Sequence, residues 1–149
     1  MNWKLTRLLS AIVLGATLAA GCGGDNSTPT APSVNVPFST TTLREGSGAQ
    51  AAVGNALTVN YTGWLYSTTA ADNKGTQFDT SIGKTPFTFI LANNQAIPGF
   101  LQGVLGMRVG ELRRIVIPPN LAYGTQGSPP QIPGNATLIF EVDLLTLVQ

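Results

Sequence analysis

The chain of 149 residues carries eight Lys or Arg and seven Asp or Glu residues, no histidine and a single cysteine. One cysteine excludes an internal disulfide, and the lack of histidine argues against zinc sites and against Ser-His-Asp or Cys-His catalysis. The few basic residues form no cluster of the kind that binds nucleic acid, so we expect no metal, no cofactor and no nucleic-acid partner.

The first 22 residues resemble the leader of a bacterial lipoprotein. Lys4 and Arg7 precede an apolar run of 13 residues, 8–20, which is too short to span a bilayer comfortably. The run leads into LAAGC at 18–22, which resembles a lipobox. We therefore expect residues 1–21 to be a signal peptide and the Cys22 that follows to be lipidated with acyl chains such as palmitate.

Residues 22–37 are the expected lipidated cysteine and a flexible linker. Gly, Ser, Thr, Asn and Pro dominate this segment, so it cannot bury enough apolar surface to fold. It contains no helix-forming stretch that would serve as a dimerisation arm. We expect a monomer that is lipid-anchored to a membrane of the cell envelope and faces the periplasm or the exterior.

Residues 38–149 have the pattern of one small domain rich in β-strands. Segments in which apolar residues alternate with polar ones predict strands at 56–62, 87–91, 112–117 and 136–145. In the last of these, one face carries Leu138, Phe140, Val142 and Leu144. The adjacent Arg113 and Arg114 are expected at a strand edge.

One segment departs from the strand pattern. In 99–106, Phe100, Leu101, Val104 and Leu105 recur at helical spacing, and a glycine at the end provides a stop signal. A single short helix against an antiparallel sheet gives an α+β fold. The sheet has to bend around the helix so that both apolar faces are buried.

The Gly- and Pro-rich segment 118–134 is expected to be a functional loop. Loops of this length in compact domains are usually functional or disordered. Its aromatic residue, Tyr123, and Ile132 favour a packed flap.

Nine short motifs follow one another along the domain. They are VNYTG at 59–63, FDTS at 78–81, PFTF at 86–89, AIPGF at 96–100, GVLGM at 103–107, VGE at 109–111, IPP at 117–119, AYG at 122–124 and ATLIF at 136–140. In this order and at this spacing they resemble the FKBP family of prolyl isomerases. The resemblance runs from about Thr42 to Leu147. Each motif is weak alone, but their order and spacing together are specific.

The resemblance implies an antiparallel half-barrel sheet of about five strands wrapped on one short helix, with a pocket between them. It implies a peptidyl-prolyl cis-trans isomerase with Asp79, Tyr123 and Ile97 as catalytic residues. Residues that match the family's substrate pocket are Tyr61, Phe78, Phe87, Ala96, Phe100, Ile132 and Phe140. The implied partners are proline-containing polypeptides, and the implied inhibitors are macrolides of the rapamycin type.

Four departures from the family pattern are specific to this chain. Phe100 stands where many members have tryptophan, which implies a deeper pocket. The segment 82–84 lacks the arginine that commonly pairs with the pocket aspartate. Gln131 replaces an aliphatic residue, and 67–76 lengthens a hairpin tip.

Rotation about an X-Pro bond makes and breaks no covalent bond, so it needs no nucleophile, metal or imidazole. The chemistry therefore agrees with the composition, and we reject Thr80 and Ser81 as nucleophiles because nothing near them in the sequence would activate them. Two other functions stay open at this point. One is a proline-peptide-binding or holdase module with weak turnover, and the other is a structural lipoprotein in which the aromatics are core residues and Asp79 caps a turn.

Overall fold

The structure, a computed structural model, describes residues 34–92 and 94–149. The predicted signal peptide, Cys22 and residues 22–33 of the predicted linker lie outside the described residues. Among the residues that are described, no helix is long and apolar enough to cross a membrane.

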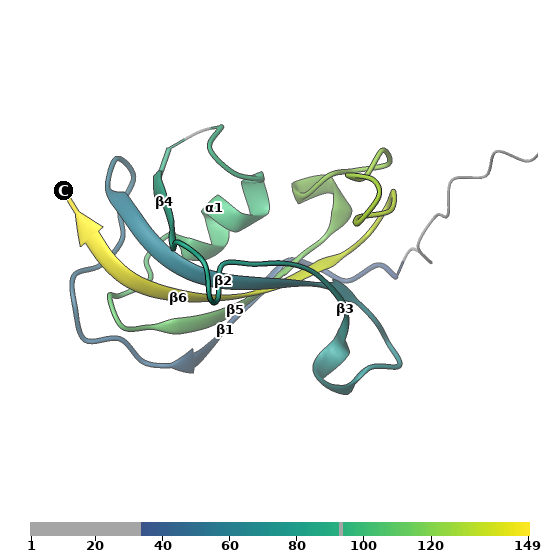
Figure 1. Ribbon diagram of the computed structural model, residues 1–149, viewed down its shortest axis with the longest axis horizontal. Coiled ribbons are helices and arrows are strands. Elements are labelled where there is room, and N and C mark those ends of the chain that lie inside the picture. The colour runs from purple at the N-terminus through teal and green to yellow at the C-terminus, as the bar shows by residue number, and fades with distance from the viewer. Residues whose placement is uncertain (1–33, 93) are drawn as a thin grey trace, which may run out of the picture.

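Six antiparallel strands form one curved sheet (Figure 1). They are β1 (Ser39–Arg44), β2 (Ala56–Tyr66), β3 (Lys74–Thr80), β4 (Phe87–Ile90), β5 (Leu112–Ile117) and β6 (Leu138–Val148). Their order is β1-β5-β6-β2-β3, with β4 also paired to β2. The expected antiparallel sheet with one short helix is confirmed, with six strands where about five were expected. The pattern missed β1, whose six residues are all exposed, and β3, which has no alternating apolar face.

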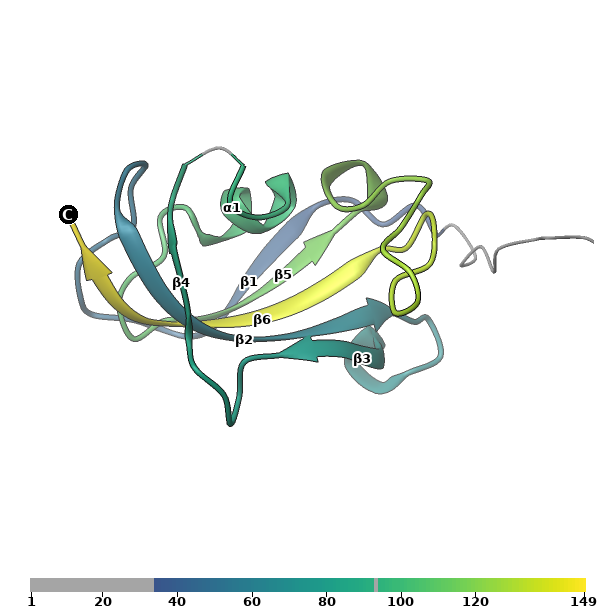
Figure 2. The ribbon, with the colours of Figure 1, turned by 45° about the horizontal axis from the view of Figure 1, so that its top comes forward.

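β3 and β4 share one edge of β2, which leaves a gap between them. β3 pairs with β2 from Thr62 to Tyr66, and β4 pairs with it from Ala56 to Val59. Figure 2 shows the connection between β3 and β4 swinging away from the sheet at this point. Tyr61 lies on β2 in the gap, outside the paired registers with β3 and β4.

The alternating residues of the two long central strands build the core. In β6 the predicted apolar face is confirmed, because every second residue from Leu138 to Leu144 is fully or almost fully buried. In β2, Leu57 and Val59 are fully buried. Most residues at alternate positions, such as Thr58, Thr62 and Glu141, carry hydroxyl or charged groups to the opposite face, although Ile139 on that face is only 1% exposed. The main hydrophobic core therefore lies on the concave side.

The helix α1 (Pro98–Val104) packs on that concave side (Figure 2). It begins one residue before and ends two residues before the expected range 99–106. Pro98 suits the first helical position because its fixed φ fits a helix and its missing N–H has no intrahelical role there. Gly106, with φ 77°, follows the end of the helix. A Cβ atom on Gly103 would lie 2.5 Å from the Ile115 side chain, so this glycine allows α1 to approach β5 closely.

The expectation that Arg113 and Arg114 lie at a strand edge is wrong. They are on β5, which pairs with β1 on one side and β6 on the other. Arg113 donates to the carbonyl oxygens of Gly103 and Leu105, at the end of α1. An interior strand tolerates the arginine there because the last carbonyls of a helix lack partners within the helix.

The hairpin between β2 and β3 is tied to the convex face of the sheet. Its tip forms the short 3-10 helix η1 (Ala71–Asn73). Lys74 lies 2.6 Å from Glu141 and also lies over the Trp64 ring, 4.7 Å from its centre. Asp72 lies 3.7 Å from Arg114. The lengthened hairpin therefore packs on the face of the sheet opposite to α1.

Candidate functional site

A cavity of about 200 Å³ lies on the concave side, between α1 and the sheet. Its walls come from six separate segments of the chain, spread from Tyr61 to Phe140. The lining residues are Tyr61, Phe78, Asp79, Phe87, Gln95, Ala96, Ile97, Phe100, Tyr123 and Phe140. The structure thus brings together nine of the ten residues predicted for catalysis and substrate binding.

Five aromatic rings form the apolar wall. Phe100 is 4% exposed and lies at the base, with its ring centre 5.3 Å from that of Phe140 and 6.1 Å from that of Tyr61. Phe78 packs edge-on against Phe140 at 5.5 Å, and Phe87 packs edge-on against Tyr61 at 6.0 Å. Edge-to-face packing of this kind stabilises a fixed arrangement of rings. The cavity is therefore a rigid apolar recess of a size that suits a small ring.

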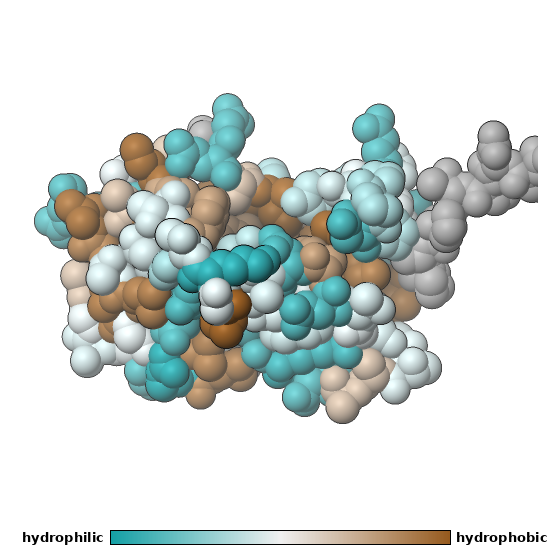
Figure 3. Space-filling model, in the orientation of Figure 1, coloured by the Kyte–Doolittle hydropathy of each residue, from teal (hydrophilic) through white to brown (hydrophobic). Residues whose placement is uncertain are grey.

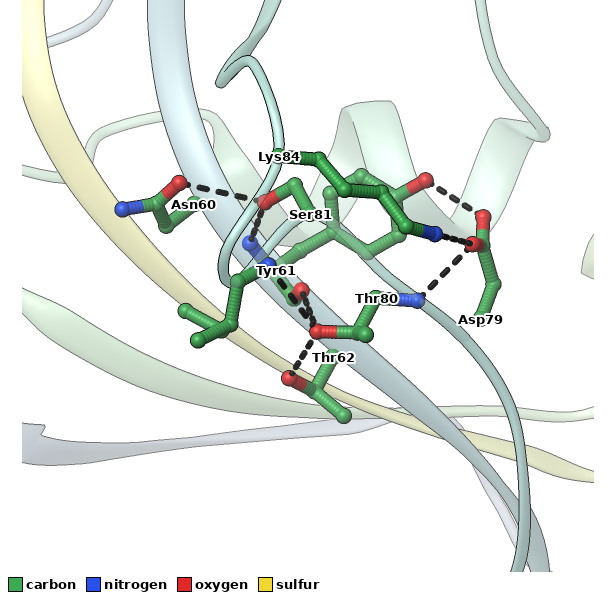
Figure 4. A network of polar contacts seen from close by, with 8 residues as sticks. Asn60, Tyr61, Thr62, Asp79, Thr80, Ser81 and Lys84 are labelled. Carbon is green, nitrogen blue, oxygen red and sulfur yellow. Dashed lines mark hydrogen bonds and ion pairs between the residues drawn. The ribbon is translucent and has the colours of Figure 1, made fainter.

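The main polar feature is a hydrogen bond between Tyr61 and Asp79 (Figure 4). The Tyr61 hydroxyl donates to Asp79 Oδ2 at 2.5 Å, and the Thr80 N–H donates to Asp79 Oδ1 at 2.8 Å. Lys84 Nζ is 3.9 Å from Asp79 Oδ1 and the Lys84 side chain is exposed. Lys84 therefore pairs with Asp79 only weakly in place of the arginine that this chain lacks. Partial burial, followed by the hydrogen bond to Asp79 and its negative charge, raises the pKa of Tyr61 well above its ordinary value. Tyr61 therefore remains a donor at any physiological pH.

A second set of hydrogen bonds fixes the end of β3 to β2, directly behind the Tyr61–Asp79 pair (Figure 4). Ser81 Oγ accepts from the Tyr61 N–H at 2.9 Å and donates to Asn60 Oδ1 at 3.2 Å. Thr80 Oγ1 donates to the Tyr61 carbonyl oxygen at 3.1 Å. The two hydroxyls rejected above as nucleophiles are thus used to hold the backbone on which Tyr61 and Asp79 stand.

The segment before α1 presents backbone groups to the cavity. The Ile97 carbonyl oxygen accepts hydrogen bonds from the N–H groups of Phe100 and Leu101, which fixes the Ile97 peptide at the start of the helix. Among the described residues, the Ile97 N–H has no hydrogen-bond partner. Gln95, which the sequence did not single out, lines the cavity while its side chain accepts from the Ile90 N–H at 2.9 Å. Its position beside Ala96 is the one signal that could have indicated it.

Of the two flap residues expected in the cavity, Tyr123 lines it and Ile132 does not. Tyr123, which follows the short 3-10 helix η2 (Pro119–Leu121), is 41% exposed at the mouth. Ile132 does not line the cavity, in contrast to the expectation. Paired hydrogen bonds between the Ser128 and Ile132 backbones close a tight loop, and the Ile132 side chain is 5% exposed within the hydrophobic core.

This arrangement fits binding and bond rotation better than proton or group transfer. Among the described residues that line the cavity, Asp79 is the one carboxylate, and it accepts a hydrogen bond from Tyr61, whose pKa is raised. Within residues 34–92 and 94–149, no group of His, Cys, Asp and Glu side chains is placed to hold a metal ion. What the cavity offers is an apolar recess, a backbone donor and two hydroxyl groups at its rim.

Comparison of the sequence with known proteins identifies a family and several relatives. The model of a family described as FKBP-type peptidyl-prolyl cis-trans isomerase matches residues 48–145. FK506-binding protein 2B of Rhizopus delemar is 50% identical over 95 residues, covering 63% of this chain and 43% of that protein. The FK506-binding protein of Neisseria meningitidis serogroup A is 42% identical over 108 residues, covering 72% of this chain and 93% of that protein.

A solved structure agrees with the sequence comparison. The crystal structure of FkpA from Escherichia coli superimposes with a TM-score of 0.62 and 36% identity, covering 74% of this chain and 47% of that one. The chain thus spans less than half the length of FkpA and of the Rhizopus protein. These matches, together with the six-stranded sheet and its single helix, show that the chain belongs to the FKBP-type peptidyl-prolyl cis-trans isomerase family.

Proposed function

We propose that this chain is a peptidyl-prolyl cis-trans isomerase that acts on proline-containing polypeptides. The observation that carries the proposal is the cavity of about 200 Å³, in which five aromatic rings stand beside the Ile97 N–H and the Tyr61–Asp79 pair. Its apolar recess suits a proline ring, and its polar groups lie at the rim, where the peptide backbone enters.

The chemical task is rotation about one amide bond. The barrier of about 18–20 kcal/mol arises because the planar amide loses resonance as it twists. The twisted amide is less polar than the planar one. A cavity that excludes water and is walled by aromatic rings therefore favours the transition state relative to water.

Three residues have proposed roles at the rim. The Ile97 N–H holds the substrate backbone by donating a hydrogen bond to one of its carbonyl oxygens, and the Tyr123 hydroxyl holds the backbone from the flap. Asp79 orients the Tyr61 hydroxyl and places a negative charge beside the rotating carbonyl. Asp79 moves no proton, because the hydroxyl that it faces has a raised pKa.

The proposed place of action is the cell envelope. The support is the sequence of the leader, with two basic residues, an apolar run and the lipobox-like LAAGC. On this proposal the chain is anchored through acyl chains on Cys22 and meets secreted or envelope proteins as they fold. Replacing Cys22 with Ser should release the chain from the membrane fraction. Retention of the Cys22→Ser chain in that fraction would count against the anchor.

The activity is tested by two-dimensional NMR exchange on a short X-Pro peptide, with and without the full chain. We expect exchange cross-peaks between the cis and trans forms at catalytic protein concentrations, and we expect rapamycin to abolish them. A folded chain that gives no acceleration would refute the enzyme and favour a proline-peptide-binding module. Acceleration that persists with saturating rapamycin would move the activity away from this cavity.

A further inference from the structure

A second hollow of about 550 Å³ lies beside the cavity, against the side of α1 that faces away from the sheet. We call it the helix groove. Its apolar lining includes Val53, Leu91, Ala96, Pro98, Leu101 and Leu105. Asn94 and Gln102 are the polar residues among the described lining, and none of that lining is charged.

The groove gathers apolar side chains that water reaches. Val53 is 74% exposed and Leu105 is 46% exposed. Single exposed hydrophobic residues are normal on a protein surface, whereas several in one hollow indicate a binding surface. In Figure 3, hydrophobic residues are visible at the left end of the molecule, near the carboxyl end of β6. A partner with apolar, uncharged side chains is the one that such a lining favours.

The groove lies next to the cavity. Ala96 lines both, so one residue's width of wall separates them. Ala96 is also next to Ile97, whose N–H points to the substrate backbone in the proposed function. A polypeptide whose proline fills the cavity therefore needs only to continue past Ala96 to place its neighbouring side chains in the groove.

We propose that the helix groove is a second binding site for the substrate polypeptide and takes apolar side chains a few residues away from the proline. This inference rests on the proposed isomerase function and names the substrates that it favours. They are unfolded chains in which large apolar residues flank the proline at short distance. Folded proteins bury such segments, so the groove directs the enzyme to chains that have not finished folding.

The position of the groove favours a polypeptide over a membrane surface. The groove lies at the start of β2, where the Leu91 N–H donates a hydrogen bond to the Asn55 carbonyl oxygen at 2.8 Å. The first described residue, Val34, lines a hollow together with Leu65 and Tyr66, at the other end of this strand of 11 residues. A strand of this length spans about 33 Å. Val34, where the N-terminal segment joins the described domain, therefore lies at the end of the domain opposite to the groove.

The groove has a kinetic signature. It is separate from the rotating bond, so its contacts are the same in the ground state and in the transition state. Such uniform binding lowers KM and leaves kcat unchanged. A leucine on the substrate should therefore raise kcat/KM through KM alone.

The test compares three peptides with the full chain. The first is a four-residue X-Pro peptide that reaches only the cavity, and the other two are twelve-residue peptides with the proline at the centre. In one of the long peptides, leucines occupy the positions two to five residues from the proline, and in the other, serines do. We expect kcat/KM for the leucine peptide to exceed that for the serine peptide by about tenfold, equivalent to about 1.4 kcal/mol.

Two variants show where the gain arises. The double variant Val53→Ser/Leu105→Ser makes the groove polar, and the ratio of kcat/KM between the leucine and serine peptides should fall to about one. The matched control is Leu43→Ser on β1, because Leu43 is 42% exposed and lies outside both hollows. The control should keep the ratio of the unmodified chain.

The outcomes separate this inference from the proposed function. Turnover of the short peptide with equal kcat/KM for the two long ones would overturn the groove and leave the isomerase intact. If no peptide is turned over, the proposed isomerase activity is refuted, and NMR titration then tests whether the groove binds the leucine peptide. The leucine peptide must then shift the amide signals of Gln102 and Leu105 at a lower concentration than the serine peptide does. If both peptides shift these signals at the same concentration, the inference is overturned. If kcat/KM is the same for the two long peptides, and the chain binds phosphatidylglycerol vesicles but the double variant does not, the groove binds a membrane surface instead.

Discussion

Replacing Tyr61 with Phe removes one oxygen atom from the cavity wall and with it the 2.5 Å hydrogen bond to Asp79. A hydrogen bond to a charged group contributes about 1.5–3 kcal/mol. The Asp79 side chain is 47% exposed, so water replaces part of the lost bond and the lower end of that range applies. If the bond orients Asp79 in the transition state, a loss of about 1.4 kcal/mol reduces kcat/KM about tenfold.

The assay is NMR exchange on the short X-Pro peptide at neutral pH, with urea unfolding in parallel to show that the variant is folded. Tyr66→Phe is the matched control, because Tyr66 lies on the same strand but outside the cavity. We expect the control to keep its activity. An unchanged rate in folded Tyr61→Phe would refute the proposed role of the hydrogen bond.

A double-mutant cycle sharpens this test. If Tyr61 and Asp79 act as one unit, the chain with both Tyr61→Phe and Asp79→Asn should lose no more activity than the weaker of the two single variants. Losses that simply multiply would show that the two side chains act independently. The hydrogen bond would then be a feature of stability alone.

Three further predictions concern the flap, the helix and the response to acid. Tyr123→Phe should lower kcat/KM about threefold to tenfold in a domain of unchanged stability, since it removes one neutral hydrogen bond at the rim; unchanged turnover would remove its role. Gly103→Ala should destabilise the domain by about 1–2 kcal/mol in urea unfolding, because the clash with Ile115 outweighs the better helix propensity of alanine, whereas Gln102→Ala should not. Burial alone would raise the pKa of Glu111, but the hydrogen bonds that its carboxylate accepts lower this pKa below its ordinary value. Its contribution to stability should be complete above about pH 5 and be lost as pH falls further, and Glu111→Gln should flatten the acid side of the curve.

The sequence alone determined the features that depend on local pattern. In β6, the period of two from Leu138 to Leu144 predicted which face is buried, because a strand turns alternate side chains to opposite sides. The spacing of the motifs indicated the family and, with it, nine of the ten residues that line the cavity. The helix was found to within two residues at each end, because its apolar spacing and its final glycine are local signals.

The tertiary structure decided what depends on residues far apart in the chain. The Tyr61–Asp79 bond exists because β3 pairs with β2 in a register that brings these two side chains together. Ile132 is in the core, not in the cavity, because the loop at Ser128 turns it inward. Arg113 and Arg114 lie within the sheet because β1, a strand with no apolar face, covers the edge of β5. In each case the deciding partner lies outside the local segment, so no periodicity within that segment contains the answer.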